Sequence, residues 1–173
     1  MSDAQMRTWA EIDLGRLKHN YTALREQLAP GCRFVGVVKA NAYGHGAVPV
    51  AQKLEEWGAD YLAVACLEEA AELRQAGVRA PILILGVTLP RYAGELLAWD
   101  AAQAVGDLET GRALSAAAVA AGRTLTIHVK ADTGMSRLGF LCDEAHLDRA
   151  AGEIAALCAL PGLRAEEIGR AHV

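Results

Sequence analysis

The strongest constraint on the fold is an alternation of short apolar runs with longer amphipathic segments, repeated along most of the 173 residues. Three of the amphipathic segments end at glycines, which are Gly58, Gly77 and Gly122. Glycine often follows the last residue of a helix because it adopts the left-handed conformation at little cost. Short apolar runs separated by helices are typical of βαβ units, whose strands are parallel. The sequence therefore predicts an α/β fold.

The alternation predicts about five parallel strands after a short first one, with helices between them. The predicted strands span 8–12, 33–39, 60–65, 82–85, 101–105 and 125–130, and another begins at 163–166. The predicted helices span 14–28 (with Asp13 as N-cap), 47–57, 67–76, 91–99, 107–121 and 142–157. An open doubly wound sheet is the alternative, but no dinucleotide-type glycine fingerprint follows an early strand. We expect a partial (β/α)8 TIM barrel, since the closed form takes eight strands.

Composition excludes several classes of function. The net charge of −4, without a dense cluster of Lys and Arg, argues against nucleic-acid binding. The most apolar stretch, 82–89, is too short to span a bilayer, and the beginning of the chain lacks a signal-peptide core, so we expect a cytoplasmic protein without a membrane partner. The four cysteines and five histidines lack ligand spacing, so we expect interior free thiols and no metal.

Lys39 marks the first candidate site, where the apolar run 34–38 gives way to a glycine-rich turn. We expect it at the carboxyl end of a strand buried on both faces, where α/β folds gather ligands and burial turns an amine into a nucleophile toward an aldehyde. The alternative is a solvated lysine at a strand end. Gly44 and Gly46 suit an anion at the next helix start, and Tyr43 either donates to that anion or is a packed ring.

The second candidate site is the segment 130–139, which follows the apolar strand at 125–129. Two cations, Lys130 and Arg137, and the carboxylate of Asp132 converge on one loop. One interpretation is a surface loop with a weak ion pair between Asp132 and Arg137. The other has the planar guanidinium of Arg137 binding a carboxylate or a phenolic oxygen. Lys130 would repel Arg137, so it either points away or is neutralised.

These two motifs resemble the corresponding segments of bacterial alanine racemases, and the resemblance covers about 7–163. It implies that Lys39 binds pyridoxal 5′-phosphate covalently and acts as acid and base on one face of the substrate Cα. Tyr43 would contact the phosphate, Arg137 would hold the cofactor's phenolic oxygen and the substrate carboxylate, and a carbamylated Lys130 would orient Arg137. Ser136 stands where the family more usually has glycine. Three further segments carry the resemblance, which are 9–14, 68–77 and 81–86.

The resemblance also implies a homodimer that interconverts L- and D-alanine for peptidoglycan precursor synthesis. In the family the second base is a tyrosine from a C-terminal β-domain of the partner subunit, and we expect that domain to be absent here. The strand at 8–12 would pair within it. We therefore expect 1–167 to be the N-terminal portion of a racemase barrel, inactive alone. The alternatives are a racemase of another amino acid and a non-catalytic pyridoxal-phosphate-binding protein of cofactor homeostasis.

The last six residues, 168–173, match one reading frame of a common sequencing-library adapter. We therefore expect a non-native tail there, and we do not equate His172 with the family histidine that packs on the cofactor ring.

Overall fold

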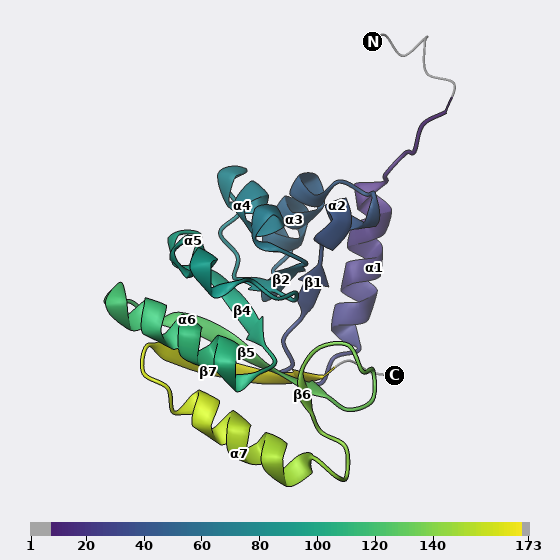
Figure 1. Cartoon of the computed structure of the whole chain (residues 1–173). Helices are drawn as coiled ribbons and strands as arrows, with labels where there is room; N and C mark the ends of the chain where they lie inside the picture. Colours follow the sequence, from purple (N-terminus) through teal and green to yellow (C-terminus); the bar gives the residue numbers. More distant parts are fainter. Residues whose placement is uncertain (1–7, 171–173) are drawn as a thin grey trace.

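The computed structural model describes residues 8–170, which form a curved parallel sheet with helices along its outer face (Figure 1). The strands follow the order β1-β2-β3-β4-β5-β7, and β6 pairs with the end of β5. Every pairing is parallel, which confirms the α/β fold and the partial-barrel expectation. The strands are β1 (Val35–Val37), β2 (Tyr61–Val64), β3 (Ile82–Ile84), β4 (Ala101–Val105), β5 (Leu125–Asp132), β6 (Phe140–Leu141) and β7 (Leu163–Arg170).

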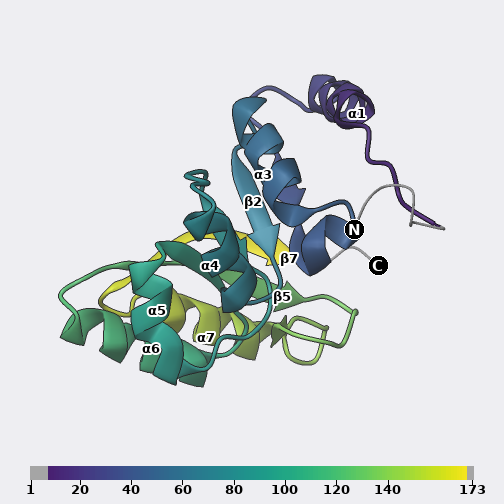
Figure 2. The ribbon, with the colours of Figure 1, turned by 90° about the horizontal axis from the view of Figure 1, so that it is seen from above.

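Helix α1 precedes β1 and the other helices lie between strands in the sequence; the helices pack along the outer side of the sheet, which Figure 2 shows from above. Asp13 caps α1 as predicted, since its carboxylate accepts the N–H groups of Gly15 and Arg16. Gly58, Gly77 and Gly122 end their segments with φ of 88°, 86° and 62°. The helical elements are α1 (Leu14–Glu26), α2 (Lys39–Tyr43), α3 (Ala47–Glu56), α4 (Leu67–Gln75), η2 (Pro90–Tyr92), α5 (Ala93–Ala98), α6 (Leu108–Ala120) and α7 (Leu147–Cys158).

The two faces of the sheet have different surroundings. The outer face and the helices form one large apolar core, whereas a small cluster around Tyr61, Ala63 and Leu83 lines the concave face. Ile127 and Val129 of β5 belong to the outer core. Because side chains alternate along a strand, the even-numbered residues of β5 point to the concave side. This alternation places Lys130 inside the curve of the sheet.

Strand β1 is not buried on both faces as predicted. Val35 and Val37 are each 43% exposed, because β1 is an edge strand that pairs only with β2 within the described residues. Gly36 faces α3, and a Cβ there would lie 2.7 Å from Cδ1 of Leu54. The missing side chain therefore lets α3 pack directly on β1, at the strand that precedes Lys39.

Other sequence predictions were also wrong. Residues 8–12 form no strand, and α7 begins at Leu147 rather than at 142, because the preceding segment forms β6 and a turn in which the Asp143 carboxylate accepts the N–H of His146. Cys32 and Cys158 are exposed thiols, not interior ones.

The end of the chain is only partly described. Strand β7 extends to Arg170, while His172 lies outside the described residues. The non-native origin of 168–173 stays a prediction. No helix within 8–170 is long and apolar enough to cross a membrane.

Candidate active site

Lys39 follows the carboxyl end of β1 and begins α2, a segment with unusual backbone geometry. Residues 40–43 have φ between 50° and 54°, which is the left-handed region. For residues with a side chain this conformation costs roughly 1–2 kcal/mol each, so the run stores on the order of 5 kcal/mol in total. Neither alanine nor tyrosine favours this region. The surrounding structure must therefore hold Lys39 and Tyr43 in this arrangement.

Side chains from α2 and α4 fasten the segment 39–46, which we call the Lys39 loop. Oε1 of Glu69 in α4 accepts the N–H of Ala40 at 2.7 Å, and its Oε2 accepts the N–H of Ala65, after β2, also at 2.7 Å. Oδ1 of Asn41 accepts the N–H of Ala47 at 2.7 Å and so occupies one donor at the start of α3. This amide is therefore not free for the anion expected at the helix start.

The second loop, residues 133–139, carries Arg137, and we call it the Arg137 loop. Its backbone is held by the buried carboxylate of Asp132. Asp132, at the end of β5, is 7% exposed. Its carboxylate accepts the N–H groups of Gly134 and Ser136 at 3.0 Å each and that of Arg137 at 3.1 Å. These backbone hydrogen bonds, above all that of Ser136, hold the pKa of Asp132 below its ordinary value.

The ion pair between Asp132 and Arg137, one of the two interpretations of this loop, is not formed in the described part of the chain. Asp132 accepts the backbone N–H of Arg137 instead, and the guanidinium is exposed at the mouth of the sheet. Ser136 has φ of 54°, in the left-handed region that glycine adopts at the least steric cost. Gly139 has φ of 129°, and a Cβ on it would lie 2.7 Å from the carbonyl oxygen of Lys130. The loop is therefore packed tightly against β5.

Lys130 connects the two loops electrostatically. Its pKa is lowered first by burial, then by the positive charge of Arg137 and then by that of Lys39, while Asp132 opposes the shift. Lys130 and Arg137 line the same cavity, and Lys39 lies near enough to Lys130 to affect its pKa. Lys130 does not point away from the mouth, because its Nζ lies 3.5 Å from the carbonyl oxygen of Leu85 at the end of β3.

A cavity of about 410 Å³ opens at this mouth. Lys130 and Arg137 line it together with Gly86 and Gly106, which follow β3 and β4. Tyr43 is 62% exposed, so it is not the packed ring of the alternative interpretation. Lys130 and Arg137 place two positive charges at this cavity, and Lys39 lies near enough to Lys130 to act on it electrostatically.

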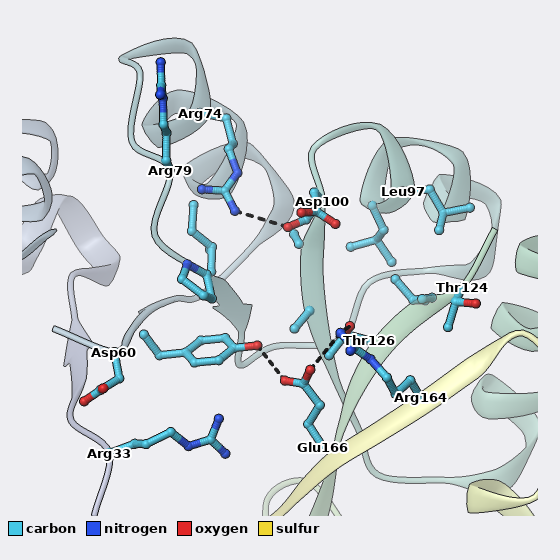
Figure 3. Close-up of a pocket in the computed structure, with 17 residues that line it drawn as sticks. Arg33, Asp60, Arg74, Arg79, Leu97, Asp100, Thr124, Thr126, Arg164 and Glu166 are labelled. Carbon is cyan, nitrogen blue, oxygen red and sulfur yellow. Dashed lines mark hydrogen bonds and ion pairs between the residues drawn. The ribbon is translucent and has the colours of Figure 1, made fainter. Parts of the chain in front are cut away.

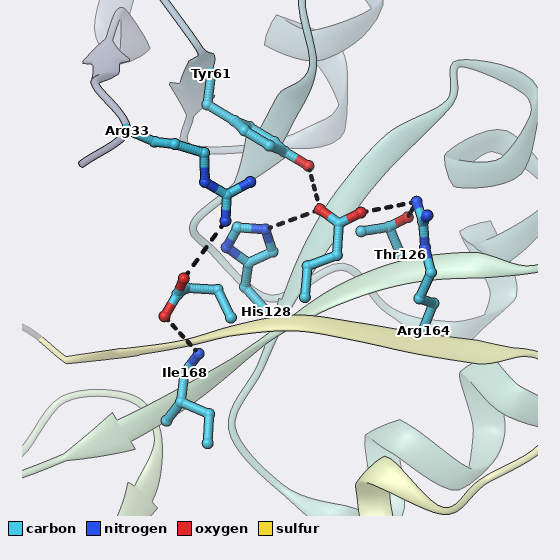
Figure 4. Close-up of polar contacts among 8 residues, drawn as sticks. Arg33, Tyr61, Thr126, His128, Arg164 and Ile168 are labelled. Atoms are coloured by element: carbon cyan, nitrogen blue, oxygen red, sulfur yellow. Dashed lines mark hydrogen bonds and ion pairs between the residues drawn. The ribbon is translucent and has the colours of Figure 1, made fainter. Parts of the chain in front are cut away.

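A cluster of polar side chains surrounds His128, which precedes Lys130 by two residues on β5 (Figure 4). Glu166 of β7 accepts the hydroxyl of Tyr61 at 2.9 Å and pairs with Arg164 at 2.8 Å. Burial and Glu166 raise the pKa of Tyr61 to about 12. Burial lowers the pKa of His128, whose Nε2 lies 3.9 Å from Glu166. This cluster therefore holds a neutral imidazole and a neutral phenol at pH 7.

A second cavity of about 390 Å³ lies at the opposite end of the sheet, where Figure 3 shows Arg33, Arg79 and Arg164 around it. Another lining residue, Arg74, donates to the carbonyl oxygens of Trp99, Val78 and Ala80 and so ties α4 to its surroundings. Residues at this end of barrel strands mostly serve stability, whereas ligands bind at the carboxyl ends. We therefore place the candidate active site at the mouth of Lys39, Lys130 and Arg137.

Sequence reasoning missed Glu69 and Asn41 as determinants of this site. Glu69 is the third residue of α4, where an acid normally reaches back to the N-cap amide of its own helix. Its position was a signal for a capping role, but not for contacts with two separate loops. Asn41 gave a weaker signal, since asparagine is enriched in left-handed positions.

Comparison with known proteins identifies the family. Residues 12–168 match the family model described as alanine racemase, N-terminal domain. The alanine racemase of Desulforamulus reducens is 46% identical over 160 residues, which cover 92% of this chain and 42% of that protein. The chain therefore spans less than half the length of this relative.

Solved structures agree with this assignment. An alanine racemase from Clostridium difficile 630 in complex with cycloserine matches with a TM-score of 0.91 and 37% identity, over 98% of this chain and 45% of that one. A histidine racemase from Leuconostoc mesenteroides matches with a TM-score of 0.70 and 32% identity, over 84% of this chain and 38% of that one. The chain belongs to the family of alanine racemase N-terminal domains.

Proposed function

We propose that this chain supplies the cofactor-binding lysine and half of the mouth of a pyridoxal 5′-phosphate-dependent alanine racemase, which interconverts L- and D-alanine. The observation that carries the proposal is that Lys130 and Arg137 line one cavity at the carboxyl end of β5, while Lys39, just after the carboxyl end of β1, acts electrostatically on Lys130. Names of relatives at 42–48% identity support the reaction and the substrate.

The residues at the mouth fit this cofactor, because it combines an aldehyde with a phosphate and a phenolic oxygen. Lys39 offers an amine for the aldehyde, and the cationic mouth with its cavity of about 410 Å³ suits an anion. When bound, pyridoxal 5′-phosphate spreads the charge left after the Cα proton departs. In this proposal Tyr43 donates its hydroxyl to the phosphate, and Arg137 binds the phenolic oxygen and the substrate carboxylate.

Lys39 has a second role in the proposal, as the group that gives or takes the Cα proton on one face of the substrate. Racemisation needs another base on the opposite face. Family membership supports a tyrosine of a partner subunit in this role, and with it a homodimer. It likewise supports a cytoplasmic enzyme that supplies D-alanine for peptidoglycan precursors. These statements concern a protein of the length of the relatives.

We also propose that Lys130 is carbamylated. The reaction joins a neutral lysine amine to carbon dioxide, forms an N–C bond and releases one proton, which leaves a carboxylate on the side chain. The lowered pKa of Lys130 raises the neutral fraction that reacts. The resulting anion would attract Arg137 instead of repelling it. Carbon-13-labelled carbon dioxide should give a carbamate signal that is lost in Lys130→Ala, and a signal that persists in this variant would contradict the assignment.

The test of cofactor binding uses this chain and pyridoxal 5′-phosphate. After reduction with borohydride, peptide mass spectrometry should find the label mainly on Lys39 and much less on Lys18 and Lys53. Lys39→Arg keeps the charge and should lose the dominant label. Labelling of another lysine as the main product, or none, would overturn the proposal.

A racemase of another amino acid is the second candidate, and the similarity to a histidine racemase favours it. Racemase assays of a protein of the relatives' length, with alanine and histidine as alternative substrates, separate the two. Faster turnover of histidine would select the second candidate.

A further inference from the structure

Glu69 makes a pair of contacts that no role in its own helix requires. Its two carboxylate oxygens accept two backbone N–H groups, each at 2.7 Å, from Ala40 after β1 and Ala65 after β2. At the third position of a helix an acid usually accepts the N–H of its own N-cap residue. Here the side chain instead joins the segments that follow two neighbouring strands, and one of its contacts is with Ala40, the residue next to Lys39.

The contact with Ala40 lies at the peptide that joins it to Lys39. The direction of the Lys39 side chain depends on the orientation of this peptide, and the left-handed run begins immediately after it. Within the described residues, Glu69 is the acceptor recorded for the Ala40 N–H. The other bonds of the loop lie further along, such as Ala42 N–H to the carbonyl of Val38 at 2.9 Å.

We propose that Glu69 is a positioning residue for Lys39, which fixes the first peptide of the Lys39 loop against the end of β2 and so aims the amine into the mouth. The proposal rests on the cofactor-binding role of Lys39. Glu69 touches neither cofactor nor substrate in it. Its carboxylate is suited to the task because two oxygens accept two donors that approach from different strands.

Glu69→Gln is the decisive variant. A glutamine has almost the same shape, but one oxygen becomes an NH2 group that cannot accept a hydrogen bond, so one of the two amides faces a donor. Glu68→Gln is the matched control. Glu68 is the preceding acid on the same turn, it is exposed, and within residues 8–170 it accepts no N–H from the Lys39 loop.

The first measurement is the extent of pyridoxal 5′-phosphate labelling of Lys39 in the 173-residue chain, at a temperature where circular dichroism shows every variant folded. We expect Glu69→Gln to need about tenfold more cofactor for half-labelling, and Glu68→Gln to stay within about twofold of the original chain. Labelling of Lys18 and Lys53 should not change in either variant. These two lysines are the internal control, since a general loss of stability would alter their labelling as well.

The second measurement is amide hydrogen exchange at Ala40 and Ala65 by NMR, without cofactor. Glu69→Gln should accelerate exchange about tenfold at one or both amides, and Glu68→Gln at neither. If Glu69→Gln does not fold, Glu69→Asp replaces it, because its shorter side chain cannot reach both amides at once.

The outcomes separate this proposal from the proposed function. Labelling of Lys39 that stays within about twofold in Glu69→Gln would overturn the positioning role, even if exchange is faster. If the original chain shows no label on Lys39, the cofactor-binding role fails. Unchanged exchange at Ala40 and Ala65 in Glu69→Gln would then refute the loop contact by itself.

Discussion

The two loops at the mouth are built in opposite ways, although each carries a cation. The Lys39 loop depends on Glu69, which lies 29 residues after Ala40, and it runs through four successive left-handed residues. The Arg137 loop depends on Asp132, whose three backbone contacts all lie within five residues. The Lys39 loop is therefore held by a tertiary contact, and the Arg137 loop largely by local contacts. Substitutions in the two loops should consequently differ in their effect on stability.

The largest effect should come from Gly139 in the Arg137 loop, with Gly44 in the Lys39 loop as the comparison. Gly139→Ala puts a Cβ 2.7 Å from the carbonyl oxygen of Lys130, a backbone atom that cannot swing away, and should cost about 3 kcal/mol. Gly44→Ala, at φ of 88° with no atom within 4 Å, meets only backbone strain and should cost about 1 kcal/mol. Urea unfolding measures both. Equal costs would show that the Arg137 loop is no more tightly packed than the other.

Asp132→Asn tests the local clamp. The new NH2 group cannot accept a backbone N–H, so at pH 7 the thermal midpoint should fall by roughly 5 °C. Asp148→Asn, an exposed acid early in α7, is the control and should change little.

The pH dependence of this difference follows from the pKa. The folded state lowers the pKa of Asp132, so below the ordinary carboxyl pKa of about 4 the unfolded chain binds more protons than the folded one. Stability from Asp132 is therefore full above that pH and is lost as the pH falls through the folded pKa. The difference in thermal midpoint between Asp132→Asn and the original chain should therefore be smaller at pH 2 than at pH 7. An equal difference at both pH values would contradict a stabilising role of the ionised Asp132 carboxylate.

Asn41 gives a smaller effect in the other loop. Asn41→Ala removes the acceptor of the Ala47 N–H and a residue that tolerates the left-handed region, and it should cost about 1–2 kcal/mol. Asn41→Asp keeps an oxygen in place and should cost less than half of that. Urea unfolding of both variants decides. Because the loops are held separately, the costs of Asn41→Ala and Asp132→Asn should add in the double variant, whereas strong non-additivity would mean that they act as one unit.

Ser136→Gly should have the smallest effect, and it should be stabilising. Ser136 lies at φ of 54°, where glycine avoids the steric cost, so a gain of about 0.5 kcal/mol is expected after the greater chain entropy of glycine is subtracted. The same change raises flexibility only within the Arg137 loop. A loss of stability in urea unfolding would show that the serine hydroxyl, which lies 3.5 Å from the carbonyl oxygen of Gly134, matters more than the backbone.

Much of the fold was predictable because it depends on local patterns. The alternation of apolar runs and helices gave the parallel sheet, and the glycine positions marked the helix ends. The edge exposure of Val35 and Val37 was not predictable, because it depends on which strands flank β1. Strand β6 has two residues and exists only through its pairing with the end of β5, so it left no pattern to detect.

The site shows the same division. Lys39, Lys130 and Arg137 were proposed as site residues from their motifs, and their placement at one edge of the sheet follows from strands that are all parallel. An ion pair between Asp132 and Arg137 was one of two interpretations of this loop, since a sequence does not show whether a carboxylate accepts hydrogen bonds from a guanidinium or from backbone amides. The contacts of Glu69 could not be predicted, because they join segments 29 residues apart. The left-handed run was equally hard to predict, because its alanines, Ala40 and Ala42, favour ordinary helices.

The distance in sequence between Ala40 and Glu69 also has a consequence for biosynthesis. While a ribosome is making the chain, the residues around Lys39 emerge before the acid that holds them has been added. Without this anchor a left-handed turn is unfavourable, so the nascent segment samples other conformations until α4 has docked. The Lys39 loop therefore reaches its folded geometry only after the second βα unit is complete.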